Sequence, residues 1–411
     1  MLYVNPHATR APYPAELQDI MSIARAAQSR EWLSHWDGLN AGSTPLRSLP
    51  DLAAALGIRQ LLVKDEALRS ALGSFKALGA PIALVRLILR AFDTKGFTAK
   101  GLLTGEHADS LRDFTVISAT DGNHGRALAA AAERIGCQCV IVLHAHVSEE
   151  REQAIAAYGA RIVRIAGNYD ASVEEAAALA ENQGWHVVSD TSYEGYDVIP
   201  RDVMQGYGTI AAEVVETLAG GETGAANEAT PMTHVFLQGG VGGLAAGIAS
   251  YLWERWGVWR PTMVVVEPEQ ADCLYQSAMA GRPARATGTV DSVMAGLACG
   301  ETSPLAWRFL QPSVDAFMTV TDAQAVQTMR RLAQGSANDV PFVAGESGVA
   351  GLAGLVQAVA FPVWTAALGL NADSRVLVIN TEGATAPAVF AELVGETDAA
   401  VTARQHEWLE R

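Results

Sequence analysis

The sequence predicts an α/β protein of two lobes, each with a mainly parallel sheet flanked by helices. Short runs rich in β-branched residues alternate with longer alanine-rich stretches between about Thr115 and Asp190. A second set of such runs begins at Thr233 and ends at Asn380. This alternation is typical of βαβ units and of a parallel sheet. The length of 411 residues also exceeds what a single hydrophobic core usually covers.

The expected elements follow one another along the chain. In the first set, the predicted strands are residues 115–119, 139–143, 161–167 and 186–190. In the second set, they are residues 233–238, 263–267 and 375–380. Polar segments at 94–112 and 219–231 have the composition of surface loops near lobe boundaries. We therefore expect a large domain of residues 1–90 and 210–411 and a small α/β domain of residues 91–209.

The charge balance argues against two classes of partner. The 29 Lys and Arg residues face 45 Asp and Glu residues, which gives a net charge of −16. A strongly acidic protein repels nucleic-acid phosphates and anionic membrane surfaces. No apolar run reaches membrane-spanning length, and the N-terminal segment lacks the basic and apolar regions of a signal peptide. We therefore expect a cytoplasmic protein that binds neither nucleic acid nor a membrane.

The four cysteines are too few and too scattered for a disulfide framework. No pair of histidines at metal-ligand spacing accompanies them, so no metal site is expected. Cys273 and Cys299 both lie in segments rich in turn residues, which leaves a single bridge between them open.

A glycine-rich loop directly follows the predicted strand 233–238 and precedes an apolar helical stretch. Glycine lets the backbone approach an anion closely, and the unpaired N–H groups of a helix start attract negative charge. We predict that this loop binds a phosphate group through the residues Gly239, Gly240, Val241, Gly242, Gly243 and Leu244. The segment also satisfies the dinucleotide fingerprint G-x-G-x-x-A, and Glu267 ends the next strand where a ribose-binding acid would lie. An NAD-dependent oxidoreductase is therefore a second interpretation of this loop.

Lys76 lies between small residues and precedes a strongly apolar stretch. Most lysines are solvated, so a lysine by itself is weak support for a catalytic role. Here the residues Gly73, Ser74 and Phe75 come directly before it, and a helix is expected to begin with it. Burial at such a place lowers the pKa of a lysine ammonium and favours Schiff-base chemistry. Lys76 is therefore a candidate Schiff-base lysine.

The turn after the predicted strand 115–119 contains four polar residues, Thr120, Asp121, Asn123 and His124. Asp121 or Asn123 could serve only as the cap of the alanine-rich helix that follows. The turn also offers backbone N–H groups at a helix start, which suit the carboxylate of a substrate. Both interpretations stay open for either residue alone.

Taken together, the three segments resemble the fold-type II enzymes that depend on pyridoxal 5′-phosphate (PLP), the tryptophan synthase β-like family, over nearly the whole chain. The resemblance implies a homodimer whose large domain binds PLP in the cleft between the lobes. In that family a lysine after a Ser-Phe pair holds PLP as a Schiff base, and an asparagine in a GNH turn bonds the ring hydroxyl. Lys76 with Phe75, and Asn123, match these positions.

The resemblance also implies roles for two further segments. The loop 239–244 matches the loop that holds the PLP phosphate. Thr381 matches the residue beside the pyridine nitrogen, with Asn380 as the alternative. A neutral hydroxyl at that place suits elimination better than transamination.

One branch of the family, the diaminopropionate ammonia-lyases, resembles the segment 189–210 and the motifs DGNHGR, GSFKALG and NTEGAT. The residue before GNH is usually small and neutral in dehydratases, whereas here it is Asp121. A carboxylate that faces the substrate needs a cationic partner, such as the β-ammonium of 2,3-diaminopropionate. Asp190 ends the predicted strand 186–190 and is a second candidate, although a turn or cap role is equally open. We expect the substrate to contact Thr120, Asp121, His124 and Asp190.

The resemblance implies a β-elimination that converts 2,3-diaminopropionate into pyruvate and ammonia. The catalytic residues are then Lys76, Asp121 and Asp190, with Lys76 as the base on one face and Asp121 as the base on the other. Two bases on opposite faces would let the enzyme accept both the D and the L enantiomer. A serine or threonine dehydratase, or a related β-replacement lyase, would use the same cofactor residues and is the alternative. A PLP-carrying protein without catalysis is a third possibility.

Overall fold

The computed structural model describes residues 1–120, 122–145, 147–167, 169–218 and 230–411. The chain forms two compact units, which are described separately. Unit 1 comprises Met1–Ile23, Ser43–Leu68 and Ile210–Arg411. Unit 2 comprises Ala24–Gly42 and Arg69–Thr209.

These units differ from the expected domains in one respect. The chain crosses between them at 209/210, and the segments 24–42 and 69–90, which we placed in the large domain, lie in unit 2. The reason is the packing of α4 (Ala80–Ala91), whose residues from Ala80 to Arg86 are all buried. This helix packs against α5 (Ala99–Leu103) and α7 (Asn123–Ile135) of unit 2.

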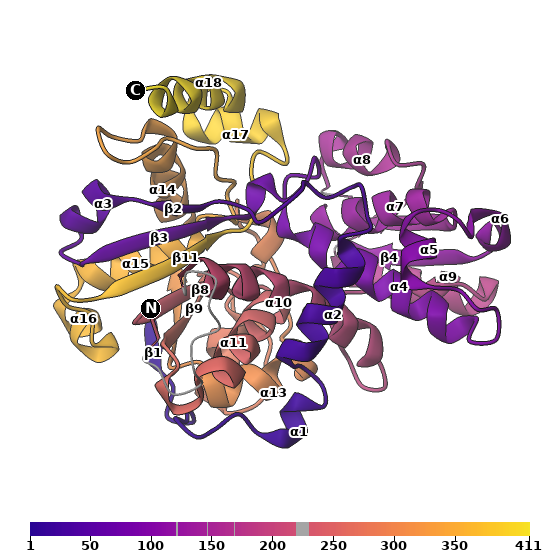
Figure 1. The fold of residues 1–411 in the computed structure, drawn as a ribbon, viewed down its shortest axis with the longest axis horizontal. Coiled ribbons are helices and arrows are strands. Elements are labelled where there is room, and N and C mark those ends of the chain that lie inside the picture. The colour runs from indigo at the N-terminus through magenta and orange to yellow at the C-terminus, as the bar shows by residue number, and fades with distance from the viewer. Residues whose placement is uncertain (121, 146, 168, 219–229) are drawn as a thin grey trace. The chain divides into compact units, whose positions relative to one another are not determined.

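Unit 1 is built on one mixed sheet. Its strands are β1 (Leu2–Val4), β2 (Leu46–Ser48), β3 (Gln60–Asp65), β8 (His234–Gln238), β9 (Thr262–Pro268), β10 (Ala316–Val320) and β11 (Arg375–Asn380). They lie in the order β1-β10-β9-β8-β11-β3-β2 (Figure 1). The five central strands run parallel, and the edge strands β1 and β2 pair antiparallel with β10 and β3. The central strands are almost wholly buried, which explains why their sequences are apolar throughout and do not alternate.

The helices of unit 1 include α15, which carries much of the core. They are α1 (Ala15–Gln18), α3 (Pro50–Ala55), η1 (Glu66–Leu68), α11 (Gly243–Trp256), η3 (Gly257–Trp259), α12 (Cys273–Ala280), η4 (Ala295–Leu297), α13 (Pro304–Ser313), α14 (Asp322–Gln334), α15 (Ala350–Ala360), α16 (Pro362–Leu368), α17 (Pro387–Val394) and α18 (Asp398–Leu409). The core joins strand residues such as Phe236, Val264 and Met318 to Leu352 and Leu355 of α15. This burial of apolar surface is the main force that holds unit 1 together.

Unit 2 contains a parallel sheet in the order β6-β5-β4-β7. Its strands are β4 (Thr115–Ala119), β5 (Gln138–Leu143), β6 (Arg161–Arg164) and β7 (His186–Val187). Its remaining helices are α2 (Ile23–Leu33), which starts at the boundary, η2 (Phe75–Leu78), α6 (Ala108–Leu111), α8 (Glu149–Ala156) and α9 (Tyr169–Gln183). The helix α10 (Val198–Leu218) passes through the boundary and contributes residues to both units.

Two strands of unit 2 are shorter than the sequence predicts. The central strands β4 and β5 are buried and pack against Ala176 and Ala180 of α9. The predicted strands 161–167 and 186–190 shrink to four and two residues, because β6 and β7 are edge strands with one neighbour each. The predicted class of two α/β lobes with mainly parallel sheets is nevertheless confirmed.

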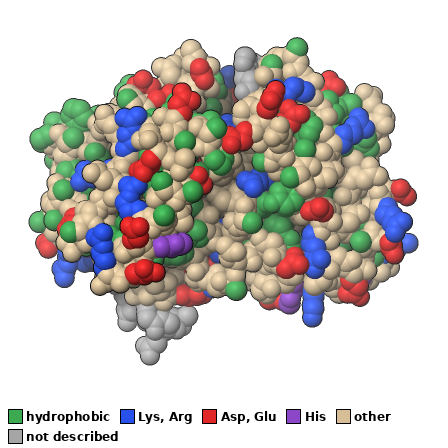
Figure 2. Space-filling model, turned by 90° about the horizontal axis from the view of Figure 1, so that it is seen from above, with side chains coloured by type: hydrophobic (Ala, Val, Ile, Leu, Met, Phe, Trp, Pro, Cys, Tyr) green, Lys and Arg blue, Asp and Glu red, His purple; other side chains and the backbone are tan. Residues whose placement is uncertain are grey.

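Charge, hydropathy and the state of the cysteines complete the description. Acidic and basic side chains are interspersed over the face that Figure 2 shows. Among the described residues, no single helix has the length and hydropathy to cross a membrane; α15 and α16 reach them only together, and they meet at a bend of 112°. Cys273 and Cys299, for which a bridge was left open, form no disulfide with each other.

Candidate active site

Lys76 lies on the 3₁₀ turn η2, and not at the start of a helix as expected. Gly73 has a φ of 71°, a left-handed conformation that glycine adopts without strain, and Ser74 returns the chain to an extended form. The N–H of Gly79 donates to the carbonyl of Lys76 over 3.1 Å and closes the turn. The long helix α4 begins only at Ala80. The turn therefore presents Lys76 ahead of a buried helix that anchors it.

The amine of Lys76 forms an ion pair and a hydrogen bond with the carboxylate of Asp190. The two side chains are 18% and 16% exposed, so the pair is largely screened from water. Burial by itself raises the pKa of Asp190, but the charge of Lys76 and the hydrogen bond from Lys76 lower it below its ordinary value. Asp190 is therefore a carboxylate, and it stabilises the ammonium form of Lys76.

His124 lies in the first turn of α7 and is 3% exposed. Its Nε2 donates a hydrogen bond to the carbonyl of Val188 over 2.9 Å, since a carbonyl can only accept. Burial and the charge of Lys76 lower the pKa of His124, although Asp190 raises it. The ring is therefore neutral with its proton on Nε2, and Nδ1 is an acceptor 3.9 Å from the carboxylate of Asp190. No described residue donates a hydrogen bond to this Nδ1.

The structure thus brings Lys76, His124 and Asp190 together within unit 2. Thr120 lies in the same turn, where its hydroxyl accepts the N–H groups of Gly122 over 3.2 Å and of Gly125 over 3.3 Å. Thr120 therefore holds the start of α7, a task that the sequence had suggested for Asp121 or Asn123. Asn123 is the first residue of α7. Asp121, the proposed second base, lies outside the described residues.

Phe75 also lies in unit 2, directly before Lys76. Its ring packs on that of Tyr207 with centroids 4.8 Å apart. Tyr207 and Tyr196 are two residues near the site that the sequence interpretation did not single out. The hydroxyl of Tyr196 donates to the carbonyl of Val187 over 2.9 Å and accepts from the N–H of Ser189 over 3.0 Å, which holds the chain just before Asp190. The only signal for either tyrosine was that both lie within the segment 189–210.

In unit 1, the glycine-rich loop connects β8 to the 14-residue helix α11. Gly240 and Gly242 have φ values of 66° and 102°, which other residues rarely adopt. A Cβ on Gly239 would lie 2.4 Å from Cγ of Glu267, and one on Gly242 would lie 2.9 Å from Cδ1 of Leu310. The loop is therefore a bare backbone with no space for side chains at these glycines, and it ends at unpaired helix N–H groups. These features fit the phosphate of PLP.

Thr381 follows the neighbouring strand of the same sheet. The strands β8 and β11 run parallel with Phe236 opposite Val378, so Gln238 and Asn380 end them at the same level. Asn380 donates to Asp65 over 2.9 Å and to the carbonyl of Val343 over 3.2 Å, so its N–H donors are already used. Thr381, which is 3% exposed, therefore stays the candidate partner of a pyridine nitrogen. The loop and Thr381 lie at one edge of the sheet, as expected for a ligand site.

Glu267 does not serve as a ribose-binding acid. It is fully buried, and it accepts the N–H groups of Leu274 over 2.9 Å and Tyr275 over 2.7 Å at the start of α12. Burial raises the pKa of Glu267 to about 8, despite these two hydrogen bonds. The residue is therefore part of the support of the glycine loop, and the dinucleotide interpretation loses its second element.

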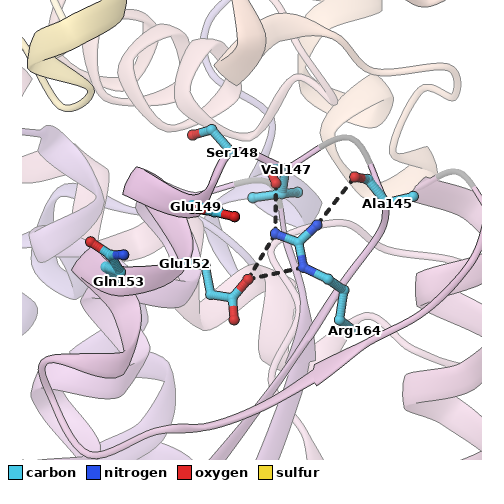
Figure 3. Close-up of a pocket in the computed structure, with 7 residues that line it drawn as sticks. All are labelled: Ala145, Val147, Ser148, Glu149, Glu152, Gln153 and Arg164. Carbon is cyan, nitrogen blue, oxygen red and sulfur yellow. Dashed lines mark hydrogen bonds and ion pairs between the residues drawn. The ribbon is translucent and has the colours of Figure 1, made fainter.

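A pocket of about 570 Å³ on unit 2 is separate from these residues (Figure 3). Arg164 crosses it and pairs with Glu152 over 2.7 Å, while it also donates to the carbonyls of Ala145 and Val147. Figure 3 shows these bonds converging on one guanidinium. Arg164 is therefore bound by other residues that line this pocket, and no predicted site residue lies among them.

Comparison with known proteins agrees with this geometry. The family model described as pyridoxal-phosphate dependent enzyme matches residues 39–382. The diaminopropionate ammonia-lyase of Escherichia coli (strain K12) is 37% identical over 395 residues, which cover 95% of this chain and 96% of that protein.

Two crystal structures of the Escherichia coli diaminopropionate ammonia-lyase are also similar. One is in complex with an aminoacrylate-PLP azomethine reaction intermediate and has a TM-score of 0.83. The other is in complex with D-serine and has a TM-score of 0.84. Each is 35% identical and covers 96% of both chains. The chain therefore belongs to the pyridoxal-phosphate dependent enzymes and, among them, to the diaminopropionate ammonia-lyase family.

Proposed function

We propose that this protein is a PLP-dependent ammonia-lyase that converts 2,3-diaminopropionate into pyruvate and ammonia by β-elimination. The observation that carries the proposal is the cluster of Lys76, Asp190 and His124, which places two hydrogen-bond acceptors beside the lysine. The similarity to the Escherichia coli enzyme over almost the whole of both chains supports it.

Residues from the predicted motifs would hold the cofactor. Lys76 would bind it covalently, with Phe75 beside it, and Asn123 would contact its ring. The loop Gly239–Leu244 would bind its phosphate, and Thr381 would bond its ring nitrogen. When bound, PLP supplies the electron sink that stabilises the carbanion left by loss of the α-proton.

We propose that Asp190 and His124 bind the β-ammonium group of the substrate. A mostly buried carboxylate requires a cationic partner, which Lys76 provides when its amine is free. Once Lys76 is bonded to the cofactor, a substrate cation can take this place. The unprotonated Nδ1 of His124 faces the same carboxylate oxygen and offers a second acceptor. Serine and threonine carry a neutral hydroxyl at Cβ, so this arrangement favours a diamino acid.

Two bases are proposed for the α-proton. Lys76 accepts it on one face once the substrate has displaced its amine, and Asp121 accepts it on the other. An enzyme with this pair handles both enantiomers. The complex of the Escherichia coli relative with D-serine supports binding of a D-amino acid in such a site.

Asp190→Asn tests the role of the carboxylate. Loss of one partner of a buried charge pair costs about 2–5 kcal/mol, so we expect kcat/KM for diaminopropionate to fall at least ~30-fold. We expect a much smaller change for serine, because serine brings no second cation. Release of pyruvate and ammonia from each substrate measures both rates.

The matched control is Asp197→Asn, since Asp197 is an exposed carboxylate seven residues further along. It should leave both rates unchanged. An Asp190→Asn enzyme that lost activity on serine and diaminopropionate equally would contradict the proposed recognition of the β-ammonium.

We further propose a homodimer in the cytoplasm. The family resemblance supports the dimer, and the absence of disulfides among the four cysteines, all of which the structure describes, agrees with a reducing compartment. Sedimentation equilibrium of the purified protein measures the number of chains in the assembly.

A further inference from the structure

A buried phenol lies beside Lys76. Tyr207 of α10 is 1% exposed. Among the described residues its hydroxyl has no partner at full hydrogen-bond geometry, but the amine of Lys76 lies near enough to lower its pKa against the effect of burial. Buried hydroxyl groups are normally paired, and one that is not is unfavourable unless a partner arrives at another stage.

The ring of Tyr207 faces the lysine together with that of Phe75. The amine of Lys76 lies 5.2 Å from the ring centroid of Phe75 and 6.0 Å from that of Tyr207. Among the residues that the structure describes, the titratable groups around this amine include Asp190, His124 and Tyr207. Burial raises the pKa of the Tyr207 hydroxyl, so the phenol stays neutral. A neutral hydroxyl can accept a hydrogen bond from an amine or an ammonium.

Two glycines allow the ring of Tyr207 and its helix to lie close to the turn that carries Lys76. A Cβ on Gly79 would lie 2.6 Å from Cε1 of Tyr207, and a Cβ on Gly206 would lie 1.9 Å from the carbonyl oxygen of Leu78. On the same helix, Asp202 pairs with Arg90 over 2.6 Å and with Arg86 over 3.5 Å, both from α4. The phenol therefore has a fixed position relative to the backbone of Lys76.

We propose that Tyr207 is a positioning residue whose hydroxyl holds the amine of Lys76 while Asp190 is engaged by a cationic substrate group. This inference rests on the proposed function, because the substrate cation is what takes Asp190 away from Lys76. With Tyr207 the amine keeps its place on the turn and remains close to the α-proton.

The test is a double-mutant cycle on the cofactor-free, full-length protein, which needs no substrate. The titration of the Lys76 amine is followed by reductive methylation with isotope-labelled formaldehyde, and the Lys76 peptide is identified by mass spectrometry. Asp190→Ala removes the carboxylate, and the hydroxyl of Tyr207 and Nδ1 of His124 remain as polar groups near the amine. In that background we expect Tyr207→Phe to lower the midpoint by about one pH unit, because an acceptor stabilises the ammonium form. In the wild-type background we expect less than half of this shift.

Thr209→Val is the matched control. Thr209 lies on the same helix, is 2% exposed, and also has a hydroxyl without a hydrogen-bond partner among the described residues. Its removal should shift neither midpoint. If Tyr207→Phe in the Asp190→Ala background shifts the midpoint no more than Thr209→Val does, the inference is overturned.

A second measurement does not depend on the double variant. In the holoenzyme, Tyr207→Phe should lower kcat about tenfold for the enantiomer whose α-proton Lys76 accepts, and less than about twofold for the other. An equal loss for both enantiomers would mean that Tyr207 only stabilises the fold. The titration uses the cofactor-free protein without substrate, so its result does not depend on whether diaminopropionate is the substrate. A failure of the proposed function and a failure of this inference can therefore be distinguished.

Discussion

At the scale of single residues, chemistry depends on which groups carry protons. Asp190 remains ionised because the charge and the hydrogen bond of Lys76 offset the effect of its burial. His124 remains neutral because burial and Lys76 outweigh the effect of Asp190. Since the pKa of Asp190 lies below its ordinary value, its contribution to stability persists above that value and is lost only as the pH falls into the acid range.

Asp121→Asn tests the second base. An asparagine cannot accept the α-proton, so the rate for one enantiomer should fall by about 10²-fold or more, which is the usual contribution of a general base. The rate for the enantiomer served by Lys76 should change little. The two rates are measured separately as pyruvate release from D- and L-diaminopropionate. Full activity on both enantiomers would refute the two-base proposal.

Glu267→Gln tests the protonation of the acid under the glycine loop. The pKa of Glu267 is raised to about 8 in the folded protein from 4.5, so between these values the folded protein holds a proton that the unfolded chain has released. The free energy of unfolding should therefore decrease as the pH rises through this range, by at most about 1.4 kcal/mol per unit, and level off above it.

The glutamine variant should lack this part of the slope. Urea-unfolding midpoints of both proteins at several pH values between about 5 and 9 measure the difference. Parallel pH profiles for the two proteins would show that Glu267 is ionised in the fold.

At the scale of elements, the packing of α10 on the turn η2 decides where Lys76 lies. Gly206→Ala puts a methyl group 1.9 Å from the carbonyl oxygen of Leu78, which neither backbone can accommodate without movement. Alanine stabilises a helix by about 0.5–1 kcal/mol relative to glycine, but overpacking costs about 1–3 kcal/mol. The net effect of the substitution should therefore be destabilising. We expect a lower thermal midpoint and a weaker visible absorbance of bound PLP.

Gly300→Ala is the control for this prediction, because its methyl group would meet only Val290 at 3.5 Å, an ordinary contact. It should change neither the thermal midpoint nor the absorbance. A Gly206→Ala protein as stable as the wild type would show that the helix and the turn can separate at no cost.

At the scale of the whole molecule, cofactor binding should increase the free energy of unfolding. A ligand that binds only the folded state at 100 times its dissociation constant adds about 2.7 kcal/mol to the free energy of unfolding. We therefore expect removal of PLP to lower the thermal midpoint, and its addition to restore it. Lys76→Ala should show a smaller gain, because it can hold PLP only non-covalently. Equal midpoints with and without PLP would contradict the proposed cofactor site.

The fold class and the motifs could be predicted because their signals are local. The alternation of apolar and alanine-rich segments reports βαβ units directly. The glycines of the loop 239–244 and the residues around Lys76 are contiguous in the chain, so their arrangement depends little on distant contacts. The assignment of 24–42 and 69–90 to unit 2 was missed, because an apolar helix such as α4 does not reveal which core it enters.

The sequence by itself determined the α/β class, the candidate lysine and the glycine-rich loop proposed to bind phosphate, because a strand, a turn and a helix start follow from neighbouring residues. Only the tertiary structure decided that Lys76 pairs with Asp190, 114 residues away, that Tyr207 lies against the same lysine, and that Glu267 is buried beneath the loop. Such contacts arise when distant segments pack together. Burial and charge there then set the protonation states on which the proposed chemistry depends.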